Sequence, residues 1–247
     1  MTDPVKPPES KSGDDGRSGS GVAFAVYGTV RGQGDITMTS TGHRRLVLAS
    51  RNPKKLREMS ELLADLPIEV VDLSAYPQAP RVEETAGTFV GNATLKAVQT
   101  ALAIGQWCLG EDSGLVVPAL GGAPGVDSAL YAGVHGDDAA NNARLLREMQ
   151  GLTGDQRDAY YICVAVLADP TGQVITQVEG RCYGRIAEEA RGSGGFGYDP
   201  LFLVPSYNRT FGELPPEIKQ RLSHRAQAFA QLRPVLQKLF ADPAQNP

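Results

Sequence analysis

Apolar residues in the first half of the chain recur with periods that alternate between strand and helix. An apolar run at residues 45–49 predicts a strand, and apolar side chains at helical spacing after residue 53 predict a helix behind it. A second strand is predicted at residues 68–73 and a long helix at residues 88–104. A short buried strand at residues 107–110 comes next. This alternation is typical of an α/β fold.

The second half of the chain contains more strands that follow one another directly. Residues 137–150 have helical periodicity, and a strong β-type run covers residues 159–167. Three shorter strands are predicted at residues 173–178, 181–186 and 201–204. Because a Pro-Thr-Gly turn separates the first of them from the preceding run, this block should be antiparallel.

The last predicted helix begins after Ser223, which has the chemistry of an N-cap. Pro234 should kink this helix near Ala230 or split it, because the proline ring clashes one turn back. All these elements together predict an α/β protein with a mixed central sheet flanked by helices. We expect two lobes with the active-site cleft between them.

The first 44 residues differ in composition from the rest. Residues 1–20 hold prolines, glycines and mixed charge with almost nothing apolar, so burial cannot offset the entropy cost of ordering them. We therefore expect residues 1–44 to form a disordered extension and residues 45–247 to form a single α/β domain.

Charge and hydropathy narrow the range of partners. The 247 residues carry a formal net charge of −4, which gives no overall attraction to nucleic acid or acidic membranes. No run approaches the roughly 18 apolar residues of a spanning helix, and the N-terminus does not resemble a secretion signal. We expect a cytoplasmic protein that binds neither nucleic acid stably nor membranes. Any phosphate site must come from a local cluster of lysines and arginines.

Two adjacent acids, Glu111 and Asp112, follow the short strand at residues 107–110, where the apolar run stops. Ser113 and a glycine come directly after them. Mg²⁺ prefers hard oxygen ligands and is often held by one or two carboxylates together with substrate phosphates. The pair therefore indicates a metal site in a cleft. A solvated turn rich in Asp, Ser and Gly has the same composition and is the alternative.

A second polar cluster follows the first predicted strand. Asn52 is a favoured N-cap, and Pro53 suits the first position of a helix. The N–H groups at a helix start attract anions, and Lys54 and Lys55 add full charge beside them. This combination favours a triphosphate tail, although the lysines alone would also fit a solvated helix face.

Glu84 and Lys96 frame the long helix at residues 88–104. Asn92 and Lys96 are four residues apart and share one helix face. If this helix packs beside the strand that carries Asp112, Glu84 and Lys96 can reach the same cleft. An acid ahead of a helix also complements the helix dipole, so Glu84 taken alone does not decide between site and structure.

Six motifs occur in the order in which a known enzyme family has them, between about Arg45 and Phe240. They are Ser50-x-Asn52-x-x-Lys55, Glu84 to Ala97, Glu111-Asp112-Ser113-Gly114-Leu115, Gly121 to Val126, Gly194 to Pro200 and Ser223-His224-Arg225. The chain thus resembles the inosine triphosphate pyrophosphatase family. Those enzymes hydrolyse deaminated purine nucleoside triphosphates (ITP, dITP and XTP) to the monophosphate and pyrophosphate, which removes them before incorporation into DNA or RNA. Relatives commonly carry Asp where this chain has Glu111, a change that leaves Asp112 in place.

The resemblance implies roles for residues at the phosphate end of a substrate. Glu84 and Asp112 would hold Mg²⁺, with Mn²⁺ as a possible substitute, and Asp112 would also orient or deprotonate the attacking water. The residues that would contact the substrate near its phosphates are Ser50, Asn52, Lys55, Lys96 and Ser113. Lysines there act as charge-assisted donors to phosphate oxygens.

The resemblance also implies a base-binding end. Residues that would contact the base and sugar are Phe196, Gly197, Tyr198 and Asp199. Lys219, His224 and Arg225 would address the oxygen-bearing edge of the base. A site that donates to a 6-keto oxygen cannot satisfy the amino group of adenine, and each buried mismatch costs about 1–3 kcal/mol.

Two other functions fit part of this pattern. One is a pyrophosphatase of similar architecture that acts on other nucleotides, such as modified pyrimidine triphosphates. The other is a non-catalytic nucleotide-binding protein, which the presence of both acids and both lysines disfavours. The family resemblance also implies a homodimer, whereas periodicity identifies no interface.

Overall fold

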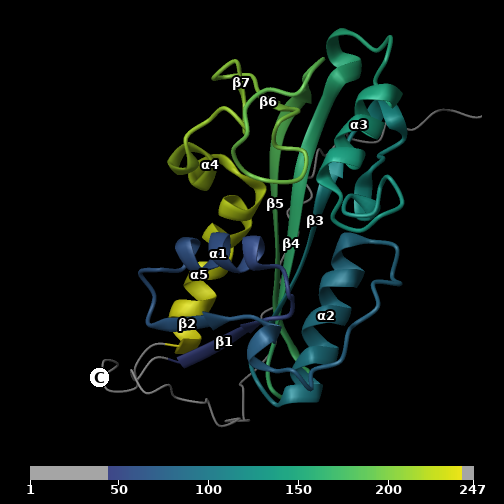
Figure 1. The fold of residues 1–247 in the computed structure, drawn as a ribbon. Coiled ribbons are helices and arrows are strands. Elements are labelled where there is room, and N and C mark those ends of the chain that lie inside the picture. Colours follow the sequence, from purple (N-terminus) through teal and green to yellow (C-terminus); the bar gives the residue numbers. More distant parts are fainter. Residues whose placement is uncertain (1–43, 241–247) are drawn as a thin grey trace, which may run out of the picture. The chain divides into compact units, whose positions relative to one another are not determined.

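The computed structural model describes residues 44–240 (Figure 1). The predicted disordered extension lies outside the described residues apart from Arg44, which begins the first strand. The strands in this range are β1 (Arg44–Leu48), β2 (Ile68–Val71), β3 (Cys108–Val116), β4 (Asp158–Ala168), β5 (Val174–Ile186), β6 (Phe202–Val204) and β7 (Arg209–Thr210). The α-helices are α1 (Pro53–Leu62), α2 (Phe89–Ile104), α3 (Asp138–Glu148), α4 (Pro216–Leu222) and α5 (His224–Phe240).

The seven strands described form one sheet in the order β2-β1-β3-β4-β5-β6-β7. β1 is parallel to both β2 and β3, and every pairing from β3 to β7 is antiparallel. The predicted mixed sheet is therefore confirmed. Its parallel part comes from the alternating first half of the sequence, and its antiparallel part comes from the hairpin-connected second half.

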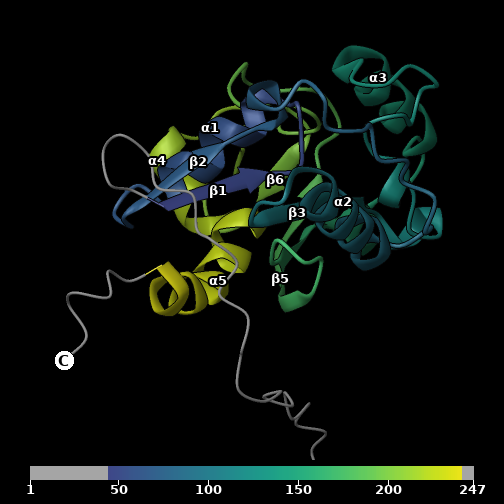
Figure 2. The same cartoon turned by 90° about the horizontal axis from the view of Figure 1, so that it is seen from below.

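Helices cover both faces of the sheet, as the two views in Figures 1 and 2 show for α5 and α2. Successive residues of a strand point to opposite faces. Leu46 and Leu48 accordingly join a core with α1 and α5, whereas Val47 joins a core with α2. This alternation explains why residues 46–48 of β1 are all apolar, since a strand segment covered on both faces has no solvated side.

A third core lies between the far ends of β4 and β5 and the elements around α3. Its members include Leu115, Leu145 and Phe202, all fully buried. Within residues 44–240, no helix combines the length and the apolar character needed to cross a bilayer.

Two predicted element boundaries are wrong. The strands predicted at residues 173–178 and 181–186 are one continuous strand, β5. Gly180 lies in its middle because α5 packs directly on it: a Cβ there would sit 2.2 Å from the carbonyl oxygen of His224. The last helix continues through Pro234 as one element, so of the two predicted alternatives the split is wrong. Its predicted start is confirmed, since Ser223 Oγ accepts a hydrogen bond from the N–H of Ala226 at 3.1 Å.

Candidate active site

One large cavity of about 1300 Å³ opens beside β3. All residues predicted to contact substrate or metal line it, which are Ser50, Asn52, Lys55, Glu84, Lys96, Asp112, Ser113, Phe196, Gly197, Tyr198, Asp199, Lys219, His224 and Arg225. They come from segments that are far apart in the sequence, from Ser50 to Arg225. The fold therefore brings the predicted residues together.

The cavity exists because β1 ends before β3 does. β1 pairs with β3 only at Cys108 and Leu109, whereas β3 stays paired with β4 as far as Val116. Beyond Leu109, one edge of β3 has no neighbouring strand within the described residues and forms a wall of the cleft. Glu111 and Asp112 lie in the middle of this strand. The expectation that they follow its end is therefore wrong.

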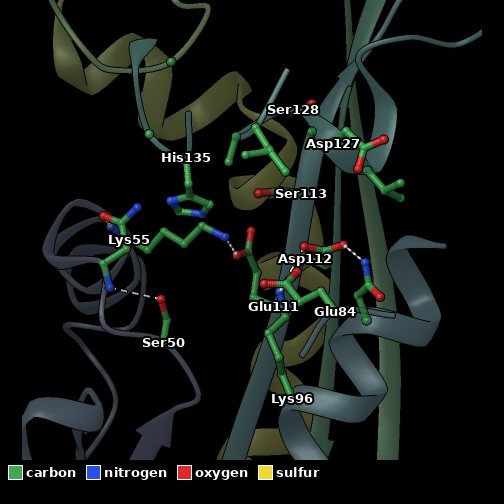
Figure 3. Close-up of a pocket in the computed structure, with 18 of the residues that line it drawn as sticks. Ser50, Lys55, Glu84, Lys96, Glu111, Asp112, Ser113, Asp127, Ser128 and His135 are labelled. Atoms are coloured by element: carbon green, nitrogen blue, oxygen red, sulfur yellow. Dashed lines mark hydrogen bonds and ion pairs between the residues drawn. The ribbon is translucent and has the colours of Figure 1, made fainter. Parts of the chain in front are cut away.

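The side chains of Glu111 and Asp112 lie on opposite faces of the sheet, because neighbouring residues of a strand point to opposite faces. Glu111 accepts from Lys55 Nζ of α1 at 2.5 Å and from Arg225 Nε of α5 at 3.2 Å. Asp112 faces α2, where Lys96 Nζ donates to its Oδ1 at 2.9 Å. Figure 3 shows both carboxylates reaching the cleft from the same strand.

Glu84 and Asp112 converge on one cation. Lys96 Nζ donates to Glu84 Oε2 at 2.7 Å and to Asp112 Oδ1 at 2.9 Å. Asn92 links the two segments, because its Nδ2 donates to Asp112 Oδ2 at 3.3 Å and its Oδ1 accepts from the backbone of Ala86 at 3.1 Å. The loop that carries Glu84 is thus attached to the helix that faces Asp112.

Close packing of α2 against β3 sets this arrangement. Gly110 lies where the helix crosses the strand, and a Cβ at that position would be 2.0 Å from the carbonyl oxygen of Ala93. Only a residue without a side chain allows the backbones to come so close. The approach places Lys96, one turn further along α2, within reach of Asp112.

The three acids differ in pKa because their surroundings differ. Burial raises the pKa of Asp112 to about 6, against the opposing charge of Lys96, and nearby Glu84 adds to the rise. Burial also acts on Glu84, but Lys96 outweighs it and lowers that pKa. For fully buried Glu111, Lys55 and Arg225 overcome the burial penalty and hold the pKa well below its usual range. Asp112 is therefore the carboxylate best suited to accept a proton near neutrality.

The start of α1 borders the cavity and has the predicted cap. Asn52 Oδ1 accepts from the N–H of Lys54 at 2.9 Å and of Lys55 at 3.4 Å, which confirms the N-cap. Ser50 Oγ accepts from the N–H of Asn52 at 3.1 Å and holds the turn between β1 and the helix. Lys55 extends from this turn toward the cleft and Glu111 (Figure 3).

Cations surround the ring of Phe196 at the other end of the cavity. Lys219 Nζ lies 4.7 Å and the Arg225 guanidinium 5.4 Å from the ring centroid. Asp199 Oδ2 accepts from Lys219 at 2.8 Å and from the N–H of Phe196 at 2.8 Å. Arg225 also donates to Ser113 Oγ at 2.8 Å, so this end of the cavity is connected to β3.

His224 and Tyr198 are both buried side chains at the edge of the cavity. The His224 ring stacks on Tyr161 with centroids 4.8 Å apart, and burial, reinforced by Arg225, lowers its pKa well below its usual range. Its buried Nδ1 has no hydrogen-bond partner among residues 44–240. Tyr198 borders the cavity, but its hydroxyl donates to the Ser128 carbonyl at 2.8 Å.

Comparison with known proteins identifies the family. The family model described as "Ham1 family" matches residues 46–235, which is most of the chain. The chain belongs to the Ham1 family. This agrees with the resemblance inferred from the six motifs, and the fold is that of solved Ham1 structures.

The matches to related proteins span nearly the whole length of each relative. A protein of Rhodopirellula baltica named dITP/XTP pyrophosphatase is 48% identical over 194 residues, which cover 78% of this chain and 93% of the relative. A HAM1 protein structure from Coxiella burnetii aligns with a TM-score of 0.72 at 42% identity, over 78% of this chain and 98% of that one. A structure titled nucleoside-triphosphatase / dITP/XTP pyrophosphatase, from Mycobacterium abscessus, aligns with a TM-score of 0.64 at 42% identity over 78% and 99%.

The Ham1 cleft also uses residues that the sequence pattern did not single out. Glu58 of α1 accepts from Lys219 Nζ at 2.8 Å and from Arg225 Nη1 at 2.9 Å, and thus holds both of the cations beside Phe196. Its position three residues after Lys55, on the same face of α1, was the available signal. Asp138 at the start of α3 is a second such residue, because it borders the cavity, whereas its neighbour Asp137 caps the helix by accepting from Ala140 N at 2.9 Å.

Proposed function

We propose that this Ham1 protein hydrolyses deaminated purine nucleoside triphosphates, namely ITP, dITP and XTP, to the nucleoside monophosphate and pyrophosphate. The observation that best supports this proposal is that a single cavity has a carboxylate pair with two lysines at one end and an aromatic ring with cations at the other. This is the distribution of charge and surface that a nucleoside triphosphate requires.

The donor set of the cleft fits a divalent metal that is shared with substrate. Among residues 44–240, no group of three or more His, Cys, Asp or Glu side chains is placed to hold a metal ion alone. Glu84 and Asp112 supply carboxylate oxygens, and Mg²⁺ is commonly bound by one or two carboxylates with phosphates completing its shell. We propose Mg²⁺, with Mn²⁺ as a substitute. When bound, the ion would neutralise charge on the phosphates.

The protein groups then have distinct tasks in the reaction. The oxygen of a water molecule forms a bond to the α-phosphorus, and the bond from that phosphorus to the oxygen bridging to the β-phosphate breaks. Asp112 accepts the proton of the water, a role that its raised pKa favours. Lys55 and Lys96 bind phosphate oxygens beside the start of α1, where Ser50 and Asn52 lie. The leaving group is pyrophosphate.

Selection of the base follows from the donors at the far end. The base stacks on Phe196 while Lys219 and Arg225 direct N–H groups toward its edge. A keto oxygen at position 6 accepts these hydrogen bonds, whereas the amino group of adenine leaves them unsatisfied. Each such mismatch costs about 1–3 kcal/mol, or roughly 5- to 150-fold in specificity. His224 and Asp199 orient this end, and Ser113 links it to the reacting centre.

A panel of triphosphates assayed for pyrophosphate release with Mg²⁺ tests the proposal. We expect kcat/KM for ITP, dITP or XTP to exceed that for ATP and GTP by at least tenfold. Preference for a modified pyrimidine triphosphate would favour the other pyrophosphatase class. Absence of turnover with retained nucleotide binding would favour a non-catalytic binding protein. Either result refutes the assignment.

We also propose that the protein is a cytoplasmic homodimer that acts on free nucleotides and does not bind nucleic acid stably. The resemblance to the pyrophosphatase family supports the dimer, and the net charge of −4 argues against coating nucleic acid. Light scattering of the full chain should give about twice the mass of 26.3 kDa. A monomeric mass would contradict the dimer without affecting the proposed reaction.

A further inference from the structure

The backbone of the loop that carries Phe196 is held by two side chains of α3. The N–H of Gly197 donates to Asp138 Oδ2 at 2.9 Å, and the Gly197 carbonyl accepts from Asn142 Nδ2 at 2.8 Å. Asp138 and Asn142 are four residues apart and therefore lie on one face of α3. The backbone N–H and C=O of one residue, Gly197, are thus both bound by side chains of one helix.

Asp138 and its neighbour Asp137 have different functions. Asp137 Oδ1 accepts from the N–H of Ala140 at 2.9 Å and caps α3. Asp138 Oδ2 instead turns to the Phe196 loop and to Lys54 Nζ, which lies 3.4 Å away on α1. The side chains of that ion pair are 50% and 39% exposed, so solvent weakens it. The contact with the loop backbone is the stronger of the two.

Two carboxylates hold consecutive N–H groups in this loop. Asp199 accepts from Phe196, and Asp138 accepts from Gly197, so the peptide between them cannot rotate without breaking one bond. The Phe196 ring, carried by this stretch of backbone, lies 4.7 Å from Lys219 Nζ. Both Asp138 and the loop border the substrate cavity.

We propose that Asp138 and Asn142 are positioning residues for base binding, which fix the Phe196 ring relative to Lys219 and Arg225. The proposal rests on the proposed function, because it takes Phe196 as the surface on which the purine stacks. Among the described residues, Asn142 makes no hydrogen bond with Lys55, Lys96 or the carboxylates, and Asp138 reaches the start of α1 through its exposed 3.4 Å ion pair with Lys54, which solvent weakens. Loosening the loop should therefore weaken recognition of the base and leave recognition of the phosphates intact.

The test compares a ligand that has a base with one that has none. For Asp138→Ala and Asn142→Ala we expect the KM for ITP to rise about tenfold, the scale of one lost hydrogen bond to a charged or well-held group. The inhibition constant of inorganic tripolyphosphate, measured with Mg²⁺ in the same assay, should stay within about twofold of wild type. Asp138→Asn retains an acceptor oxygen for Gly197, so its KM for ITP should stay close to that of the wild-type protein.

Asp137→Ala is the matched control. It removes the adjacent cap and should lower the melting temperature while leaving the KM for ITP and the tripolyphosphate inhibition constant unchanged. A purely structural role of Asp138 would instead lower the melting temperature without separating the two ligands. Equal weakening of ITP and tripolyphosphate, an unchanged KM in both alanine variants, or the same KM rise in Asp137→Ala would overturn the proposal.

Hydrogen exchange of the full chain without nucleotide separates this inference from the function on which it rests. The amide of Gly197 should exchange at least tenfold faster in Asp138→Ala than in the wild-type protein or in Asp137→Ala. If the wild-type protein hydrolyses none of the three triphosphates, the proposed function fails while faster exchange still supports the fixed loop. Unchanged exchange at Gly197 refutes the positioning role whatever the substrate.

Discussion

Replacing Asp112 by asparagine should make the metal-free protein more stable while abolishing turnover. The pKa of Asp112 is raised by burial from its ordinary 3.8 to about 6. Each pH unit of such a difference corresponds to ~1.36 kcal/mol, so the ionised carboxylate lowers the free energy of unfolding by about 3 kcal/mol above pH 6. Asparagine resembles the protonated acid in shape and never ionises. For a domain of this size the gain corresponds to a rise of about 6–12 °C in melting temperature.

The effect must depend on pH in a definite direction. The folded pKa is raised, so the protonated acid favours folding below about pH 3.8, and that advantage is lost as pH rises through about 6. Thermal unfolding in a chelator at pH 8 should show the full difference between variant and wild type, and at pH 5 about half of it. A variant that melts below the wild type at pH 8 would refute the reasoning and favour a structural ion-pair network.

Glu111→Gln is the matched control, because the adjacent carboxylate should respond in the opposite sense. The pKa of Glu111 is lowered, with Lys55 and Arg225 outweighing the effect of burial, so its charge stabilises the fold. Removing one partner of a buried ion pair typically costs about 3–5 kcal/mol. The glutamine variant should therefore melt well below the wild type at pH 8. If both neutral variants shifted the melting temperature in the same direction, the assignment of opposite roles to the two acids would be wrong.

Three further changes test the remaining parts of the cleft. Lys96→Met leaves Glu84 and Asp112 without their shared cation, so the metal-free protein should lose about 3–5 kcal/mol of stability, and Mg²⁺ should raise its melting temperature more than that of the wild type. Glu58→Gln should lower the ratio of kcat/KM for ITP to that for ATP about tenfold, since Lys219 and Arg225 lose their common carboxylate. Gly110→Ala should reduce the free energy of unfolding by about 3 kcal/mol or more in denaturant titrations, because its Cβ would lie 2.0 Å from a backbone oxygen of α2; an unchanged midpoint would contradict the close packing.

Local chemistry made much of the fold predictable. The cap at Asn52 and the proline after it specify the start of α1, and Thr88 and Gly105 bound α2 at the predicted residues. Periodicity distinguishes strands from helices because it records which faces are buried. The motif order then assigned the substrate residues, although composition alone left a solvated turn as an alternative for Glu111 and Asp112.

The errors arose where tertiary contacts override the local pattern. Charged residues in β3 look like the end of a strand, since nothing nearby in sequence shows that cations from three helices neutralise them. Gly180 looks like a break in β5 unless α5 is known to pack on it. Glu58 and Asp138 were missed for the same reason, because their partners lie 161 and 59 residues away in sequence.

The alternation of side chains along β3 explains why two neighbouring acids are not interchangeable. Glu111 points toward α1 and α5, where it joins Lys55 to Arg225. Asp112 points toward α2, where it meets Lys96 and shares that cation with Glu84. A shift of one residue in the pairing of β3 with β4 would exchange these environments. The register of an interior strand therefore decides which carboxylate is held permanently ionised by cations and which is left able to accept a proton.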